Sequence, residues 1–125
     1  MKVYLSGPIT DTPGYREAFD AADDYLRSLG HEVYNPAAMG DEFGDGPGGW
    51  GQYLARDLQC ILTAGIEAVA VLEGWQGSRG ARLEVHAAVA AGIPILCART
   101  LQPLPVRFVL AMSTEHVSDL AEAPQ

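Results

Sequence analysis

The chain has 125 residues, of which 48% are hydrophobic and 19% charged, a composition typical of one globular domain rather than of a disordered chain. Acidic residues outnumber basic ones 16 to 8, and the resulting net charge of −8 argues against binding to polyanionic nucleic acids or to anionic membrane surfaces. Nine of the acids lie between Asp11 and Asp45, where only Arg16 and Arg27 oppose them.

The first half of the chain predicts two short strands around one helix. Residues 2–5 form a β-branched and aromatic run that stops at a Ser-Gly-Pro turn. Apolar residues then recur at helical spacing from Tyr15 to Leu29, and Gly30 is placed to end this helix. A second strand is predicted over residues 31–34. Residues 40–51 hold six glycines and show no periodicity, so we expect a mobile loop that acts as a flap.

The second half continues the alternation of helices and strands. Apolar spacing predicts a helix from Tyr53 to Leu62 that ends near Gly65, and residues 66–72 are nearly continuous apolar sequence, typical of a central parallel strand. A loop over 74–80 precedes an alanine-rich helix over 81–91, which Gly92 closes, and a strand over 93–97. In the tail we favour a short helix over 106–112 and a last strand around 116–119.

Strands that alternate with helices indicate βαβ units and a parallel sheet. We therefore predict an α/β fold, a single-domain three-layer sandwich over residues 1–125 with a mostly parallel, flavodoxin-like or Rossmann-like sheet. Ligands of such sheets bind beyond the carboxyl ends of the strands, so the site is expected in the loops after the strands.

The sequence shows neither a secretory signal pattern nor an apolar run of the length that a membrane span needs. Cys60 and Cys97 are isolated in apolar surroundings and are expected to be free thiols, and the three histidines complete no zinc pattern with them. We expect a cytoplasmic protein without a metal or another cofactor.

The segment from Ser6 to Asp11 joins the first strand to the first helix. Gly7 lets the backbone approach a ligand closely, and the hydroxyls of Ser6 and Thr10, with the amides from Ile9 onward, are suited to hold an anion at a helix N-terminus. The alternative is an ordinary tight turn that caps the helix.

A second glycine-rich segment precedes the alanine-rich helix. Ser78 is placed as its N-cap, Gly80 leaves room for a ligand in the first turn, and Glu84 shares a helix face with Gly80. Glu84 is either a site residue or a solvent-facing glutamate, and Trp75 either anchors the loop in the core or stacks on a planar base.

Asp57 lies between Leu54 and Leu58 in the preceding predicted helix. It is either an edge residue of the apolar stripe or a partner of Glu84 at the strand ends. Two carboxylates beside a planar stacking residue suit the cleavage of a glycosidic bond.

Four features follow one another in a familiar order: Y-L-S-G-P-I-T at 4–10, G-H-E-V-Y-N-P at 30–36, Asp57, and W-x-x-S-x-G-A-x-x-E at 75–84. With them, residues 2–98 resemble the small phage and bacterial proteins of the nucleoside 2-deoxyribosyltransferase-like superfamily, which includes the 2′-deoxynucleoside 5′-phosphate N-hydrolases. The resemblance implies a Rossmann-like sheet and cleavage of an N-glycosidic bond.

The resemblance also implies roles for individual residues. Glu84 matches the nucleophile, Tyr4 a tyrosine that contacts it, and Asp57 an aspartate that assists at the sugar and the base. The loops that hold the 5′-phosphate in the N-hydrolases are matched by Ser6, Gly7, Ile9, Thr10, Ser78 and Gly80. Those enzymes are homodimers in which the partner subunit supplies a serine, for which Ser113 is the nearest candidate here. Thr10 stands where the N-hydrolases have an arginine.

Three functions are compatible with these residues. The first is hydrolysis of a 2′-deoxynucleoside 5′-monophosphate to free base, the second is transfer of the deoxyribosyl group between bases, and the third is a non-catalytic nucleotide-binding module. The acids on the flap, Asp41, Glu42 and Asp45, are expected to repel a second phosphate, which favours a nucleoside or a monophosphate over a triphosphate.

Overall fold

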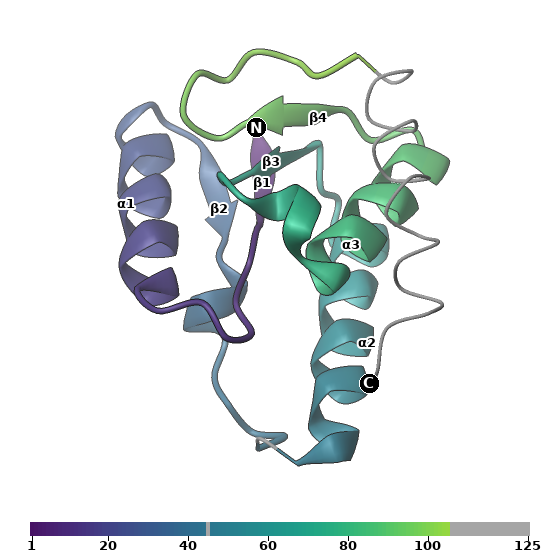
Figure 1. Ribbon diagram of the computed structural model, residues 1–125. Coiled ribbons are helices and arrows are strands. Elements are labelled where there is room, and N and C mark those ends of the chain that lie inside the picture. Colours follow the sequence, from purple (N-terminus) through teal and green to yellow (C-terminus); the bar gives the residue numbers. More distant parts are fainter. Residues whose placement is uncertain (45, 106–125) are drawn as a thin grey trace.

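The computed structural model describes residues 1–44 and 46–105, in which strands and helices alternate (Figure 1). The strands are β1 (Lys2–Ser6), β2 (Glu32–Tyr34), β3 (Ala68–Val71) and β4 (Ile95–Cys97). The helices are α1 (Tyr15–Ser28), α2 (Pro47–Thr63) and α3 (Arg79–Ala90), with short 3-10 turns η1 (Pro36–Ala38) and η2 (Trp75–Gly77).

The four strands form one parallel sheet in the order β2-β1-β3-β4. Tyr4 of β1 pairs with Tyr34 of β2 and with Val69 of β3, which in turn pairs with Ile95 of β4. Because all the strands run the same way, the segments that follow β1, β2, β3 and β4 leave the sheet at one edge.

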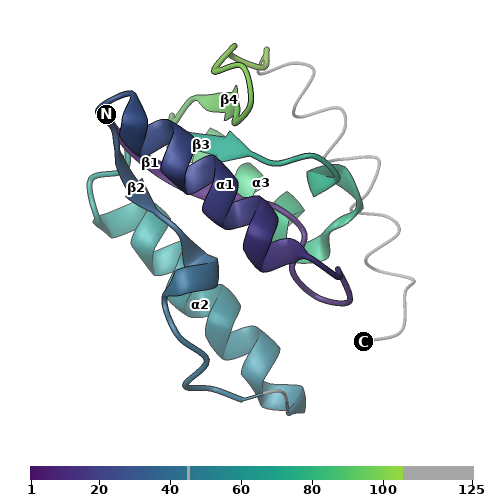
Figure 2. The ribbon, with the colours of Figure 1, turned by 90° about the vertical axis from the view of Figure 1, so that its left-hand side faces the viewer.

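Helices cover both faces of the sheet, as Figures 1 and 2 show: α1 lies on one side and α2 with α3 on the other. Val3 and Leu5 of β1 pack into a core with Phe19 of α1, whereas Tyr4 between them packs on the opposite side with Val85 of α3. Successive side chains of a strand point to opposite faces, and this alternation directs Tyr4 and Ser6 to the side of α2 and α3. The predicted three-layer α/β architecture is confirmed.

The glycines predicted to end two helices do so. Gly30 follows α1 with a φ of 91°, and its amide and that of His31 donate to the carbonyls of Arg27 and Leu26. Gly92 after α3 repeats this arrangement with a φ of 78°. Both are Schellman caps, for which glycine is preferred because its left-handed backbone meets no Cβ clash.

The predicted loop over residues 40–51 is wrong in its second half, because α2 begins at Pro47. A proline suits the first helical position, where its fixed φ fits and its missing N–H is not needed. Glycines 48, 49 and 51 carry no side chains, so hydrophobic periodicity gives no signal over this first turn and a half. The predicted loop over 74–80 likewise contains the turn η2, and the observed strands are shorter than predicted at residues 66–72 and 93–97.

The tail elements predicted over 106–112 and around 116–119 lie outside the described residues, and the extent of the domain to residue 125 stays a prediction. Within the described ranges, each helix is too short or too polar to cross a bilayer.

Candidate active site

Glu84 is buried between α3 and β1, with 6% of its surface exposed. The Tyr4 hydroxyl donates a hydrogen bond to Oε2 of Glu84 at 2.7 Å, and the Ser6 hydroxyl donates one to Oε1 at 2.7 Å. Tyr4 and Ser6 are two residues apart on β1 and so face the same side of the sheet. Glu84 is not the solvent-facing glutamate of the alternative interpretation, and each carboxylate oxygen is held by one hydroxyl.

The protonation of Glu84 is set by its surroundings. Burial raises the pKa of Glu84 to about 7, the hydrogen bonds from Tyr4 and Ser6 oppose this rise, and the nearby Asp57 adds to it. Burial also raises the pKa of Tyr4 well above its usual value, and Glu84 and Asp57 raise it further, so Tyr4 acts as a hydrogen-bond donor. A carboxyl group with a pKa near neutrality exchanges its proton readily under physiological conditions.

Asp57 of α2 is the second carboxylate of the site and is 7% exposed. Burial raises its pKa, while the Arg56 guanidinium and the Tyr4 hydroxyl oppose the rise. The Nε atom of Arg56 donates to Oδ1 of Asp57 at 3.1 Å. Asp57 and Glu84 line the same cavity, and Tyr4 is hydrogen-bonded to Glu84, so the three side chains predicted from the sequence meet in one place.

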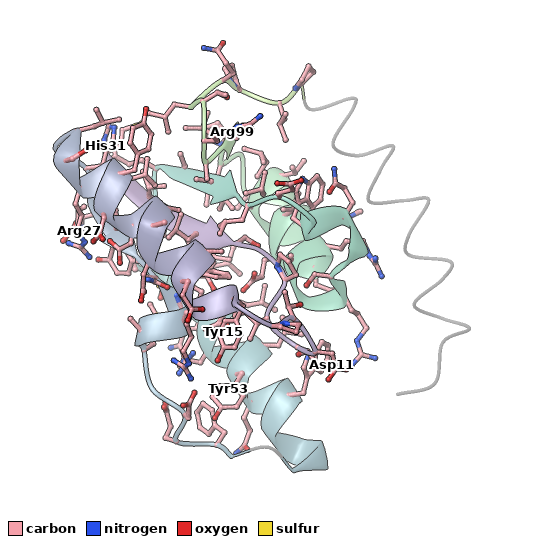
Figure 3. All side chains as sticks on the ribbon, turned by 60° about the vertical axis from the view of Figure 1, so that its left-hand side comes forward. Asp11, Tyr15, Arg27, His31, Tyr53 and Arg99 are labelled. Carbon is pink, nitrogen blue, oxygen red and sulfur yellow. The ribbon has the colours of Figure 1, made fainter. Side chains whose placement is uncertain are left out.

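A cavity of about 990 Å³ opens above these groups, within the size range of small-molecule sites. Its lining combines residues 7–12 after β1, one face of α2 that includes Asp57, and residues 77–82 with Glu84 at the start of α3. Figure 3 shows three of the lining residues, Asp11, Tyr15 and Tyr53, gathered at this end of the molecule. We call this space the site cavity.

Five of the predicted substrate-binding residues line the site cavity: Gly7, Ile9, Thr10, Ser78 and Gly80. The Ser78 hydroxyl caps α3 by accepting from the amide of Ala81 at 3.2 Å, as predicted, and it keeps its own proton for donation. A Cβ at Gly80 would meet no atom within 4 Å, so the space beside the first turn of α3 is open. At Gly7 a side chain is excluded by packing rather than by space for a ligand, because a Cβ there would lie 2.9 Å from Cβ of Leu72.

The structure gives two of the predicted substrate-binding residues other contacts. Ser6 is 1% exposed, and its hydroxyl proton is used on Glu84, which leaves it no donor for a phosphate. Trp75 is 4% exposed and packs with Val71 and Val85 in the core, and it lines another cavity, of about 860 Å³, between α1 and the ends of β3 and β4. Trp75 therefore anchors its loop and has no open ring face beside Glu84.

The sequence interpretation missed two side-chain contacts at the site cavity. The Arg79 guanidinium lies 3.9 Å from the centre of the Trp50 ring, and both side chains line the cavity. Arg56 is bound to Asp57, as described above. Trp50, Leu54 and Asp57 follow the i, i+4, i+7 spacing of one helix face, a signal that becomes visible only once the helix is extended back to Pro47.

Residues 1–44 and 46–105 contain no group of three or more histidine, cysteine, aspartate or glutamate side chains that could hold a metal ion. Ser113, the serine expected to complete a partner's site, lies outside the described residues. A metal-free site and a homodimer both stay predictions.

Comparisons with known proteins give one family and one fold. A family model described as a domain of unknown function (DUF4406) matches residues 1–97. No curated protein sequence matches the chain. A solved structure of a 2-deoxyribosyltransferase from the psychrotolerant bacterium Bacillus psychrosaccharolyticus matches with a TM-score of 0.58 and 22% identity, over 78% of this chain and 71% of that one. At this identity the match establishes the fold.

Proposed function

The chain belongs to the DUF4406 family, and we propose that it is an enzyme that cleaves the N-glycosidic bond of a 2′-deoxynucleoside 5′-monophosphate with Glu84 as the nucleophile. The observation that carries the proposal is the buried Glu84 carboxylate, held by Tyr4 and Ser6 at the base of a cavity that also contains Asp57. The fold shared with a 2-deoxyribosyltransferase supports the same chemistry.

In the first step, an oxygen of the Glu84 carboxylate forms a bond to C1′ of the deoxyribosyl group while the bond from C1′ to the base nitrogen breaks. The bonding pair leaves with the base, and Asp57 supplies the proton that neutralises it. Positive charge develops on the sugar in the transition state, and the two carboxylates stabilise it. Tyr4 and Ser6 act as positioning residues that keep the Glu84 oxygens directed toward the sugar.

In the second step, water attacks C1′ and the bond to the Glu84 oxygen breaks, which restores the carboxylate. The water gives a proton to Asp57, so the pair again holds the one proton with which the cycle began. Atoms balance with water as the only co-reactant, and the products are the free base and the sugar 5-phosphate.

The preference for a 5′-monophosphate is supported by the helix N-terminus that lines the site cavity. The N-terminus of α3 presents the Ser78 hydroxyl and the open space at Gly80, and Arg79 lies beside them. The acids expected to repel further phosphates are partly neutralised, because Asp41 pairs with Arg16 at 3.0 Å and Glu42 with Arg56 at 3.4 Å. The discrimination against triphosphates is therefore expected to be modest.

A second candidate is transfer of the deoxyribosyl group to another base. It differs in the second step alone, in which a base nitrogen in place of water attacks C1′. The structural similarity to a 2-deoxyribosyltransferase supports this second reaction.

The test is incubation with a panel of 2′-deoxynucleosides and their 5′-monophosphates, with and without an acceptor base, followed by chromatography of the products. Free base without an acceptor identifies a hydrolase, and a new nucleoside identifies a transferase. Glu84→Ala should abolish either product, whereas Glu17→Ala, which changes an exposed glutamate of α1, should not. A wild-type protein that binds these compounds and turns over none of them would refute the proposal in favour of a binding module.

The predicted homodimer belongs to the same proposal. Sedimentation or light scattering measures its mass, and Ser113→Ala tests whether that residue contributes to the site. If the protein is a monomer at assay concentration with full activity, the shared site is refuted.

A further inference from the structure

Arg56 is connected to more groups around the site cavity than its place on the surface of a helix would suggest. Its Nε atom donates to Asp57 at 3.1 Å, and its Nη1 atom donates to the carbonyl of Gly40 at 3.0 Å and to the Glu42 carboxylate at 3.4 Å. The guanidinium also lies 5.2 Å from the centre of the Tyr53 ring. One planar cation thus bridges a buried carboxylate and the chain before α2.

The chain bound by Arg56 is itself part of the cavity wall. Gly40, Asp41 and Gly44 line the site cavity. Tyr53 strengthens the attachment, because its hydroxyl accepts from the amide of Phe43 at 3.2 Å and its ring meets the Phe43 ring edge-on with 5.0 Å between centroids. Residues 40–43 are therefore held to α2 by two side chains, of which Arg56 alone also touches Asp57 among the described residues.

We propose that Arg56 is a positioning residue of the site, which fixes the Asp57 carboxylate and joins it to residues 40–43, of which Gly40 and Asp41 line the site cavity. This inference rests on the proposed function, since it assigns Arg56 to the same reaction. The guanidinium suits both tasks, because it presents several N–H donors in a fixed plane and keeps its charge at every relevant pH.

The electrostatic surroundings of Asp57 show what the loss of Arg56 would do. Tyr4 on β1, Glu84 on α3, Glu42 before α2 and Cys60 on α2 all interact with Asp57 and are neutral or acidic, and the guanidinium of Arg56 is the cation hydrogen-bonded to it. Arg79 and Arg82 at the start of α3 line the same cavity. The charge of Arg56 lowers the pKa of Asp57 and that of Glu84. Without that charge, both carboxyls hold their protons to higher pH.

The experiment compares Arg56→Gln with Arg16→Gln, a matched control. Arg16 repeats the arrangement on α1: it donates to the carbonyl of Ala37 at 2.8 Å, pairs with Asp41 and lies 5.1 Å from the centre of the Tyr15 ring, yet it makes no contact with Asp57. Both variants lose a guanidinium that anchors the segment before α2, and Arg56→Gln alone removes a charge from Asp57.

The first readout is the dependence of kcat/KM on pH. Arg56→Gln should move the profile to higher pH by about one unit or more, the size expected for loss of a close opposite charge, while Arg16→Gln should keep the wild-type profile. Arg56→Lys should restore the profile, because it retains the charge. If Arg56→Gln lowers kcat/KM without moving the profile, as a purely structural role would, the proposal is overturned.

The second readout does not depend on activity. The carboxyl carbon of Asp57, assigned by its loss in Asp57→Asn, is titrated by ¹³C NMR in the wild-type protein and in both arginine variants. We expect a raised midpoint in Arg56→Gln alone, and an unchanged midpoint would overturn the proposal. A raised midpoint in a protein that turns over no nucleoside would refute the proposed function and leave the Arg56–Asp57 link intact.

Discussion

Replacing Glu84 by glutamine should change how the stability of the protein depends on pH. In the folded protein the pKa of Glu84 is about 7, against 4.5 for an ordinary glutamate, because burial disfavours the charged form. Between these two values the unfolded chain releases the proton more readily than the folded one, so wild-type stability falls as the pH rises from about 4.5 to 7. Because glutamine does not titrate, the stability of Glu84→Gln should not fall in this way between pH 4.5 and 7.

The magnitude follows from the two pKa values. Each pKa unit corresponds to about 1.4 kcal/mol, so ionisation of Glu84 destabilises the fold by about 3 kcal/mol above pH 7. Glutamine is nearly the same size and can keep both hydrogen bonds, since its carbonyl accepts from one hydroxyl and its amide donates to the other. The stability advantage of Glu84→Gln should therefore be small at pH 4.5 and level off at about 3 kcal/mol above pH 7.

The assay is urea denaturation of wild type and Glu84→Gln at closely spaced pH values between 4.5 and 8. Glu17→Gln is the matched control, because Glu17 is an exposed residue in the first turn of α1 and its replacement should leave the pH dependence as in wild type. A difference between Glu84→Gln and wild type that stays constant from pH 4.5 to 8 would show that Glu84 does not titrate near neutrality, and the reasoning would fail.

Three further predictions follow from the same geometry. The dependence of kcat/KM on pH should be bell-shaped with its alkaline limb near pH 7, because the Glu84–Asp57 pair must hold one proton. A kcat/KM that instead rises through pH 7 would show that Asp57 supplies no proton. Ser6→Ala should lower kcat/KM about tenfold or more for nucleosides and monophosphates alike, since it removes a 2.7 Å hydrogen bond to Glu84, and a loss confined to monophosphates would return Ser6 to the phosphate site. Gly7→Ala should destabilise the fold by about 1–3 kcal/mol in thermal or urea unfolding, because its Cβ would meet that of Leu72 at 2.9 Å, and an unchanged midpoint would contradict the packing.

Much of the fold could be predicted from local signals. The alternation of strand and helix patterns predicted the parallel sheet, and Gly30 and Gly92 end their helices where the sequence placed them. The start of α2 could not be predicted by the same means, because glycines 48, 49 and 51 carry no side chains from which a helical period could be read. A proline at position 47 was the one local signal there, and it also suits a turn.

The site was predicted less completely than the fold, for a physical reason. Spacing along a chain shows which residues share a face, but it does not show which partner a polar side chain meets. The sequence places Ser6 in a motif suited to an anion. In the structure Ser6 is the last residue of β1, and because side chains alternate along β1, its hydroxyl faces α3 and donates to Glu84. Trp75 was ambiguous between core and ligand contact, and its burial beside Val71 and Val85 decides for the core.

The burial of Glu84 is itself an argument about function. Besides Glu84, the buried residues of α3 are Ala81, Arg82, Val85 and Ala88. Ala81, Val85 and Ala88 belong to the core, so an apolar residue at position 84 would extend that core. The structure instead holds a carboxyl group there whose ionisation destabilises the fold, and it surrounds that group with two hydroxyls and a second carboxylate. Stability alone does not account for this choice, because replacing such a buried polar group together with its partners by apolar residues of similar volume is often neutral or stabilising. A polar group in a position suited to an apolar residue is what a catalytic site requires. The hydrogen bonds fix the orientation of the buried carboxyl, and burial brings its pKa toward neutral pH.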